Sequence, residues 1–553
     1  MTLLTTQRTA PWWRDNLCYE IFPRSFADSN GDGVGDFKGI TAHLKYLANL
    51  GINSIWLTPF YPSPQADAGY DVSDYCDVDP VFGTLDDFDI LLKEAHAYGI
   101  RVIIDLVPNH TSDQHPWFKR ALAAAPGSAE REWYHFRDGL GENNELPPNN
   151  WTSLFGGSAW KRVPGEKQWY LHLFSTHQID LNWDNPAVRD AFDDILKFWL
   201  DRGVDGLRID AANNLVKAAG LPDVTPENST MTDQQYRGPM FDQDGVHDIY
   251  RRWRKLVNTY DDRVMVAEAF HVQPISRLVN YVRSDELQQA FNFDYQLSQW
   301  GATNYRAIID KYLTNMGTVN APCSWVTSSH DQVRIATRLG LTTPGATPMG
   351  LDSTTEQPNE QLGLDRARAL IMLTMILPGA LYLYQGEELG LPNHTTMEPR
   401  FRQDPRFFDS NGTMIGRDGQ RIPMPWKAKA PAFGFSPSDK SWLPQPDSYA
   451  GYAADLQEKD KHSTLSLYRR LIALRTQNAL GTGSLQWFDS PRNDVLVARN
   501  GSVCIYINFG YAPLDLPAGR VIAQSRPGID KGTQLPGNSA VWLALDEMPH
   551  TQA

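Results

Sequence analysis

The chain of 553 residues has few cysteines, no long apolar run and fewer cationic than anionic side chains. Its four cysteines, Cys18, Cys76, Cys323 and Cys504, lack metal-ligand spacing and are too sparse for a disulfide framework. No stretch approaches the about 18 apolar residues that span a membrane, and the polar segment 1–11 lacks the apolar core of a secretion signal. These absences favour reduced cysteines, no membrane partner and a cytoplasmic location.

The charge balance makes nucleic acid an unfavourable partner. The chain has 51 Lys and Arg against 65 Asp and Glu, a formal net charge of −14, which repels phosphate backbones and anionic lipids. Aromatic residues are plentiful, with 17 Trp, 22 Tyr and 23 Phe, enough to line a cleft for sugars or other rings. The expected partner is therefore a small molecule that is not anionic.

Short apolar runs alternate with helical patterns along most of the chain. Eight runs predict strands: residues 18–22, 53–57, 101–107, 204–210, 264–268, 290–293, 324–328 and 380–384. Helical patterns lie between them, as at residues 84–98, 186–202 and 364–377. Eight strand and helix units predict an α/β fold, a (β/α)₈ TIM barrel formed by residues 1–110 and 177–477.

Two segments depart from this alternation. Residues 111–176 are rich in Pro, Gly and Trp and lack a barrel-like helix, so we expect a small insertion domain after the third strand. From residue 478 to residue 553 the pattern alternates between apolar and polar positions, with turn residues between the runs. This pattern predicts a C-terminal antiparallel β-sandwich domain.

Three acidic residues follow predicted strands: Asp210 in GLRIDAANN, Glu268 in VMVAEAF and Asp331 in WVTSSHDQ. For any one of them, capping of the next helix is at least as good an interpretation as catalysis. Three together indicate a reactive site, because TIM barrels carry their active sites at the carboxyl ends of the strands. Arg208 precedes Asp210 by two positions on the same strand face and is expected to keep that carboxylate ionised.

The segment DSNGDGVGD, residues 28–36, has the pattern of a hard-cation loop. Asp28, Asn30, Asp32, Val34 and Asp36 present oxygens at alternating positions with glycines between them. The loop predicts a structural Ca²⁺ or Mg²⁺ ion, although its twelfth position is a glycine and not the bidentate Glu of an EF-hand. An Asx-rich turn without metal is the alternative interpretation. No organic cofactor is expected.

Four short motifs occur in a fixed order: DLVPNH (105–110), GLRIDAANN (206–214), VAEAF (266–270) and SSHD (328–331). They resemble those of the α-amylase family of glycoside hydrolases, family 13, and the resemblance extends over nearly the whole chain. QIDLNWDNPAV (178–188), GYDVSDY (69–75), YQGEELG (384–390) and GRDGQRIPMPW (416–426) resemble its α-glucosidase and oligo-1,6-glucosidase branch. ELPPNNWTSLFGGSAW (145–160) is similar to a segment of actinobacterial-type α-glucosidases.

The resemblance implies a role for each of the three acids. Asp210 matches the nucleophile of a retaining glycosidase, and Glu268 matches its acid/base. Such an enzyme needs one ionised and one protonated carboxyl group about 5–5.5 Å apart, so we expect the pKa of Glu268 to be raised. Asp331 matches the acid that binds the ring hydroxyls and stabilises the positively charged transition state.

Sugar-binding roles are implied for three further residues. His110 and His330 match the family's sugar-contacting histidines, and Tyr70 matches the aromatic platform beneath the ring in the cleavage site. Taken singly, each of these residues is more typical of ordinary core packing. Their places within the motifs favour the functional interpretation.

A charge pair is expected to close the pocket at the non-reducing end of the sugar. Asp71 and Arg417 resemble this pair in exo-acting relatives, and Arg421 is the alternative arginine. Such a pair would prevent longer chains from running through the site. Surface salt bridging is the other interpretation of either arginine.

The implied function is an exo-acting, retaining α-glucosidase that releases terminal α-1,4-linked glucose from maltose and short α-glucosides through a covalent intermediate, with transglucosylation as a second outcome. Ala211 supports α-1,4 action, because relatives acting on α-1,6 bonds tend to carry Val after the nucleophile. The alternative is a sugar-to-sugar α-glucosyltransferase or a trehalose synthase-type isomerase. A non-catalytic sugar-binding or transporter-associated homologue is a remote alternative, since all three acids are retained.

Overall fold

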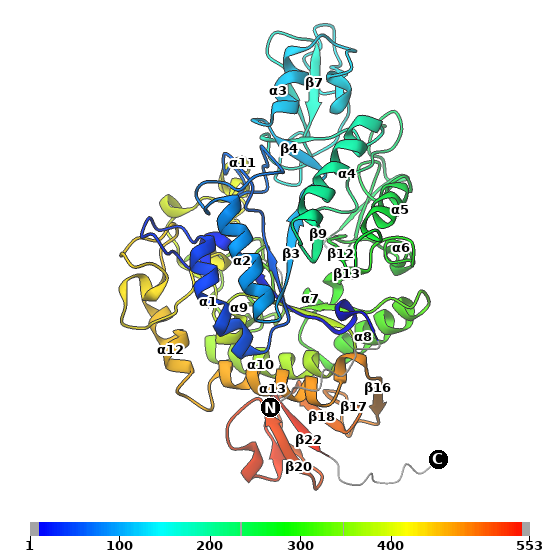
Figure 1. Ribbon diagram of the computed structural model, residues 1–553. Helices are drawn as coiled ribbons and strands as arrows, with labels where there is room; N and C mark the ends of the chain where they lie inside the picture. Colours follow the sequence, from blue (N-terminus) through cyan, green and yellow to red (C-terminus); the bar gives the residue numbers. More distant parts are fainter. Residues whose placement is uncertain (1–9, 233–234, 347, 545–553) are drawn as a thin grey trace.

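A closed barrel of eight parallel strands lies at the centre of the protein, for which the computed structural model describes residues 10–232, 235–346 and 348–544 (Figure 1). Around the barrel the order is β1-β15-β14-β13-β12-β9-β3-β2. The strands are β1 (Leu17–Ile21), β2 (Ser54–Leu57), β3 (Arg101–Leu106), β9 (Gly206–Ile209), β12 (Val264–Ala267), β13 (Gln289–Asn292), β14 (Ser324–Val326) and β15 (Ala380–Tyr384). They coincide with the eight predicted runs, and the predicted (β/α)₈ barrel is confirmed.

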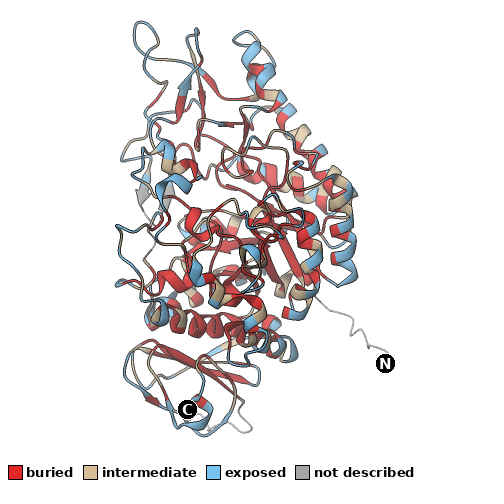
Figure 2. Cartoon of the chain, turned by 90° about the vertical axis from the view of Figure 1, so that its left-hand side faces the viewer, coloured by how far each residue is buried: buried red, intermediate tan, exposed pale blue. Residues whose placement is uncertain are grey.

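Helices surround the barrel, and their exposed faces point outward (Figure 2). Between the strands lie α1 (Phe37–Leu50), α2 (Leu85–Ala97), α4 (Pro186–Asp201), α5 (Val246–Val257), α6 (Ile275–Asn280), α7 (Phe293–Gln296), α8 (Ala302–Gly317), α9 (Ile335–Arg338) and α10 (Glu360–Ile376). Several of these helices begin at a side chain that accepts a backbone N–H group. Asp36 caps α1, Asn185 caps α4, and Thr84 caps α2 in a capping box with Asp87.

Helix α10 differs from the other helices because it is buried on nearly all sides. It lies between the barrel and the C-terminal sheet, where the Trp542 indole donates to the Met372 carbonyl at 3.1 Å. A helix covered by protein all round carries apolar residues all round, as LIMLTMI shows at its end. The C-terminal domain is thus packed directly onto the barrel.

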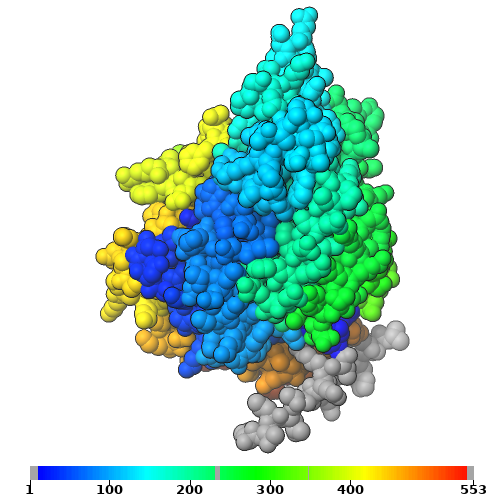
Figure 3. All heavy atoms as spheres, turned by 45° about the horizontal axis from the view of Figure 1, so that its top comes forward, coloured from blue at the N-terminus to red at the C-terminus, as the bar shows by residue number. Residues whose placement is uncertain are grey.

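An insertion between β3 and α4 projects from one end of the barrel (Figures 1 and 3). It contains α3 (Pro116–Ala123) and a three-stranded antiparallel sheet, β5 (Phe136–Asp138), β7 (Gln168–Leu171) and β6 (Trp160–Arg162). At its base, β4 (His110–Ser112) pairs with β8 (Gln178–Asp180). The antiparallel pair β10 (Thr230–Thr232) and β11 (Gln235–Arg237) follows β9.

After β15 come α11 (Pro405–Asp409), α12 (Ala454–Gln457) and α13 (Thr464–Gln477), and the chain then forms an antiparallel sheet. Its order is β16 (Leu485–Phe488), β17 (Val495–Asn500), β18 (Val503–Asn508), β22 (Ser539–Ala544) and β20 (Arg520–Gln524). A second, two-stranded sheet pairs β19 (Leu514–Asp515) with β21 (Gln534–Leu535). The expected antiparallel C-terminal domain is therefore present.

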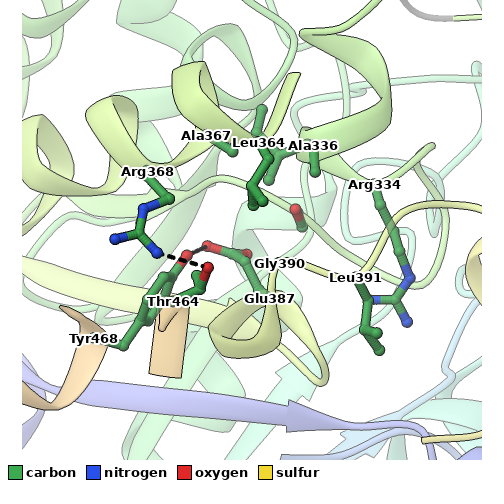
Figure 4. A pocket seen from close by; sticks show the side chains of 12 residues that line it. Arg334, Ala336, Leu364, Ala367, Arg368, Glu387, Gly390, Leu391, Thr464 and Tyr468 are labelled. Carbon is green, nitrogen blue, oxygen red and sulfur yellow. Dashed lines mark hydrogen bonds between the residues drawn. The ribbon is translucent and has the colours of Figure 1, made fainter. Parts of the chain in front are cut away.

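A small cavity of about 10 Å³ lies where α10, α13 and the loop after β15 meet (Figure 4). On one side of it, Tyr468 donates to Glu387 Oε1 at 2.9 Å and the Arg368 guanidinium donates to Thr464 Oγ1 at 2.9 Å. These bonds join the loop after β15 to α13, and α13 to α10. None of the three candidate catalytic acids lines this cavity.

Candidate active site

The acids that follow β9, β12 and β14 line one pocket at the carboxyl end of the barrel. Asp210 comes directly after β9, Glu268 directly after β12, and Asp331 stands in the loop after β14. The pocket has a volume of about 290 Å³, and the insertion contributes Leu154 and Phe155 to its wall. Parallel strands that end at one rim have brought the three predicted acids together.

Arg208 joins three carboxylates at the base of this pocket. Its guanidinium lies 2.6 Å from Asp210 Oδ1, 2.9 Å from Asp105 Oδ1 and 2.8 Å from Glu268 Oε2. The Arg208 side chain is 2% exposed and lies over the Trp56 ring, 4.9 Å from its centroid. Because a guanidinium presents five N–H donors in one plane, this single side chain can orient all three acids.

Asp105, Asp210 and Glu268 share the single positive charge of Arg208 in a buried site. Burial raises the pKa of Asp210 well above its ordinary value and also raises the pKa of Glu268, and Arg208 opposes both shifts. Burial raises the pKa of Asp105 to about 7. Arg208 therefore acts on Asp210 in the expected direction, but its charge is divided among three groups and does not outweigh burial. Burial therefore favours protonation in this cluster, and an acid/base pair requires one protonated and one ionised carboxyl group.

Asp331 has the opposite electrostatic environment. Burial alone would raise its pKa, but the positive charges of Arg417 and Arg421 oppose burial, and the pKa of Asp331 lies well below its usual range. The Arg417 and Arg421 guanidiniums lie 3.0 Å and 3.1 Å from Asp331 Oδ1. Asp331 is therefore ionised, and its negative charge contributes to the raised pKa of Glu268.

His330 is held between two aromatic rings. The Tyr70 ring stacks on it with centroids 5.3 Å apart and an interplanar angle of 11°, and the Phe22 ring stacks at 5.8 Å and 18°. His330 Nδ1 lies 2.5 Å from Glu20 Oε1, so this acid fixes the orientation of the imidazole. Burial holds the pKa of His330 well below its ordinary value. Tyr70 also donates to Asp105 Oδ2 at 3.0 Å.

His110 lines the pocket from the start of the insertion. Its Nε2 lies 3.1 Å from the Tyr70 carbonyl, and its Nδ1 lies 3.2 Å from the Asn109 amide nitrogen. Burial lowers the pKa of His110 to about 4, so the ring is neutral. His110 and Tyr70 therefore line the same pocket as Asp210, Glu268 and Asp331, whereas His330 stacks on Tyr70 and lines a smaller adjoining cavity with Glu268 and Asp331.

The charge pair at the pocket rim differs from the predicted one. Arg417 lies 2.5 Å from Asp67 Oδ1, 2.8 Å from Asp404 Oδ2 and 3.0 Å from Asp331 Oδ1. Asp71 instead accepts the backbone N–H groups of Ala66 and Asp67 at 2.8 and 2.9 Å. The prediction that Asp71 pairs with Arg417 is wrong, because Asp71 folds back onto its own loop and thereby presents Asp67 to the arginine.

The structure also distinguishes the two candidate arginines. Arg417 lines the pocket and spans the acids at the rim. Arg421 lies deeper, where its Nε donates to the His330 carbonyl at 3.1 Å. Arg417 thus lines the pocket, and Arg421 contacts the loop that carries Asp331 without lining the pocket.

Ala211 contributes backbone as well as side chain to the pocket. Its N–H donates to Glu268 Oε2 at 2.9 Å, and it has a left-handed φ of 44°. Asn213 and Asn214 line the neighbouring wall, and the aromatic side chains at this end of the pocket include Phe241 and Phe270. The residue after the nucleophile candidate thereby orients the acid/base candidate.

The loop predicted to hold a cation is closed by its own backbone amides. Asp28 accepts the N–H groups of Asn30, Gly31 and Gly33 at 2.9, 2.7 and 2.8 Å. Asp32 accepts one N–H group, from Val34 at 2.8 Å. Each carboxylate has about four acceptor sites, so Asp32 retains capacity for a further partner. Within the described chain, no group of three or more His, Cys, Asp or Glu residues is arranged to hold a metal.

Comparisons with known proteins agree with this geometry. The chain matches the family described as alpha amylase, catalytic domain, over residues 20–483. The chain belongs to the α-amylase family. Maltase 1 of Drosophila virilis is 37% identical to it over 510 residues, which cover 88% of this chain and 76% of the relative. A probable alpha-glucosidase of Rhizobium meliloti (strain 1021) is 37% identical over 493 residues, 87% of this chain and 85% of the relative.

Solved structures of this α-amylase family fold superpose over almost the whole chain. An alpha-glucosyl transfer enzyme, 36% identical, has a TM-score of 0.83 and covers 97% of this chain and 99% of its own. The trehalulose synthase from Pseudomonas mesoacidophila MX-45 has a TM-score of 0.83 at 32% identity and covers 97% and 100% of the two chains. The family therefore includes hydrolases and transfer enzymes among the relatives of this protein.

Several residues of the site were not predicted from the sequence. Asp105 and Glu20 are charged residues inside apolar barrel strands, a placement that signals a buried partner. Asp67 stands in a loop whose course the local sequence does not specify, Asp404 caps the short helix α11, and Arg406 lies in its first turn. The described part of the chain contains no helix long and apolar enough to cross a membrane.

Proposed function

We propose that this α-amylase family member is an exo-acting α-glucosidase that removes terminal α-1,4-linked glucose from maltose and short α-glucosides. The arrangement of Asp67, Arg417 and Asp331 carries the proposal. These charges close one end of a pocket whose base holds Asp210 and Glu268. A closed pocket of this size accepts the end of a sugar chain and stops the chain from passing through.

The proposed mechanism is retaining and proceeds through two displacements. Glu268 gives its proton to the glycosidic oxygen while an Asp210 carboxylate oxygen attacks the anomeric carbon, so the bond to the leaving sugar breaks and a glucosyl ester forms. Glu268 then takes a proton from water, whose oxygen displaces Asp210 from the anomeric carbon. Glu268 regains its proton and Asp210 its charge. One guanidinium contacts both carboxyl groups, which favours the short separation that this mechanism needs.

The remaining pocket residues are proposed to bind and stabilise the sugar. Asp331 is ionised and faces the same pocket, so it can bind ring hydroxyls and stabilise positive charge at the anomeric carbon. His110 and His330 would bind hydroxyl groups, with Tyr70 beneath the ring. Arg208 acts through the three carboxylates that it orients, since it is almost fully buried beneath them.

Transfer of glucose to a second sugar is the second candidate function. It is supported by the solved alpha-glucosyl transfer enzyme and by the aromatic side chains Phe241 and Phe270 at the wall next to Ala211, where an acceptor sugar could stack. The same glucosyl intermediate serves both outcomes, because either water or a sugar hydroxyl can displace Asp210. The small Ala211 supports α-1,4 linkages in the substrate.

Three further features belong to the proposal. We propose that the loop of Asp28, Asn30, Asp32, Val34 and Asp36 binds Ca²⁺ or Mg²⁺, supported by its alternating hard oxygens and by the spare acceptor capacity of Asp32. This ion would stabilise the loop before α1. The four unpaired cysteines support a cytoplasmic location, and segment 145–160 supports the actinobacterial-type α-glucosidase subgroup.

Trapping of the intermediate tests the proposal. The Glu268→Gln variant is incubated with an α-glucosyl fluoride, whose fluoride leaves without acid help, and its peptides are analysed by mass spectrometry. The peptide that contains Asp210 should gain one glucosyl unit. Absence of this adduct, with normal folding and bound sugar, would reject the covalent mechanism. The Asp210→Ala variant is the matched control and should form no adduct.

A further inference from the structure

Lys217 is a buried lysine behind the pocket, and it contacts three segments of the chain. Its Nζ lies 2.8 Å from Asp180 Oδ2 in β8 and donates to Asn109 Oδ1 at 2.9 Å. It also donates to the carbonyl of Asn214, in the loop that carries Asp210. The Lys217 side chain is 1% exposed and that of Asp180 is fully buried. Lysine is rarely buried so deeply without a specific partner.

The contact with Lys217 determines which way the Asn109 amide points. An ammonium group only donates hydrogen bonds, so the Asn109 atom facing it is the carbonyl oxygen. The Asn109 NH₂ group therefore points the other way, where it donates to Asp180 Oδ2 at 3.0 Å and faces His110 Nδ1 at 3.2 Å. Lys217 and Asp180 therefore favour the same orientation of this amide, and without Lys217 one of these two contacts is lost.

The Asn109 amide in turn determines where His110 carries its proton. A neutral imidazole has one N–H donor and one acceptor nitrogen. Since the Asn109 NH₂ group donates to Nδ1, the proton lies on Nε2, which donates to the Tyr70 carbonyl at 3.1 Å. The Gln178 amide nitrogen is also 3.1 Å from Nε2, but it has its own acceptor in Asp67 Oδ2 at 3.2 Å.

We propose that Lys217 is a positioning residue that acts through Asn109 to hold His110 as its Nε2–H tautomer and ties the Asp210 loop to the base of the insertion domain. Lys217 touches no substrate, because it does not line the pocket. Its three donors bind groups from the loop after β3, from β8 and from the loop after β9. The sugar contact of His110, and with it this role of Lys217 in catalysis, rests on the proposed function.

Two readouts on the full-length protein test this role. In ¹⁵N-histidine NMR, with the His110 signal assigned by its loss in His110→Gln, the wild type should show the Nε2–H tautomer. Lys217→Met keeps the length of the side chain but removes its charge and donors, so His110 should become a mixture of tautomers. The kcat/KM on maltose should fall by about 10- to 100-fold, the equivalent of one lost charge-assisted hydrogen bond. Lys197→Met, at a half-exposed lysine, should change neither readout.

A second variant guards against misfolding of Lys217→Met. Asn109→Asp places an acceptor beside His110 Nδ1 and keeps a partner for Lys217, so the proton should move to Nδ1. An Nδ1–H tautomer in the wild type overturns the proposal, as does a Lys217→Met protein that retains the Nε2–H tautomer or wild-type kcat/KM. A wild type that does not act on maltose would refute the proposed function, and the tautomers would still test the Lys217 contact by themselves.

Discussion

Replacing Asp67 and Asp71 separately by Asn tests the structure of the pocket rim. Asp67 accepts from Arg417 at 2.5 Å, and the two side chains are 4% and 6% exposed, so solvent screens their interaction little. Asp67→Asn keeps the shape of the side chain but removes its charge. Arg417 still contacts Asp404 and Asp331, so its charge remains paired and the cost stays below the about 3–5 kcal/mol for breaking an isolated buried pair.

We expect Asp67→Asn to lose the free energy of one hydrogen bond between charged groups, about 1.5–3 kcal/mol. This corresponds to a fall of about 10- to 150-fold in kcat/KM on maltose. Asp71→Asn is the matched control. Asp71 accepts the Ala66 N–H on Oδ2 and the Asp67 N–H on Oδ1, so the one oxygen of a carboxamide keeps one of these two hydrogen bonds and loses the other. We expect it to lower stability by about 0.5–1.5 kcal/mol and kcat/KM by less than about tenfold.

The assay measures kcat/KM on maltose and on longer malto-oligosaccharides for both variants. Because Asp67 helps to close the pocket, the preference for maltose over longer chains should weaken in Asp67→Asn and persist in Asp71→Asn. A larger loss in Asp71→Asn than in Asp67→Asn would refute the reasoning. It would show that the pair predicted from sequence, and not the one in the structure, closes the site.

Three other predictions concern the acid, the linkage and the loop. Glu268→Gln should lower kcat on maltose by about 10²- to 10⁴-fold; because burial raises the pKa of Glu268, the wild-type rate should decline as pH rises through that pKa, and this alkaline decline should be absent in the variant. Ala211→Val should raise the ratio of isomaltose to maltose turnover while both rates fall, since a β-branched residue at a φ of 44° is strained; an unchanged ratio would contradict the linkage argument. A chelator should lower the melting temperature if the loop from Asp28 to Asp36 binds a cation, and an unchanged melting temperature would favour the metal-free turn.

The barrel and the candidate catalytic acids were predictable because both leave short-range signals in the sequence. Eight apolar runs predicted the eight strands, and Asp210 and Glu268 were recognised because each follows the end of a predicted strand. Arg208 was predicted to contact Asp210 because residues two positions apart on a strand point to the same face of the sheet. The other partners of Arg208 lie on strands that are distant in sequence, so its division among three acids depends on barrel closure.

The pocket rim was less predictable because it consists of loops. Asp67 and Asp71 are four residues apart, and Arg417 lies far from both in the sequence. The sequence alone therefore does not show which carboxylate contacts Arg417. The choice between them depends on hydrogen bonds from Asp71 to the backbone of its own loop, which no periodic pattern reveals. The contacts of Lys217 were not predicted for a similar reason, because its partners come from three separate segments of the chain.

Time-resolved proton NMR of the purified protein with maltose tests the central claim most directly. The anomeric signals of each product are read during the first turnovers, before free glucose mutarotates. Two displacements at the anomeric carbon, the first by Asp210, predict that free glucose appears first as the α-anomer. Glucose that appears first as the β-anomer would contradict the retaining mechanism and the role of Asp210 as nucleophile.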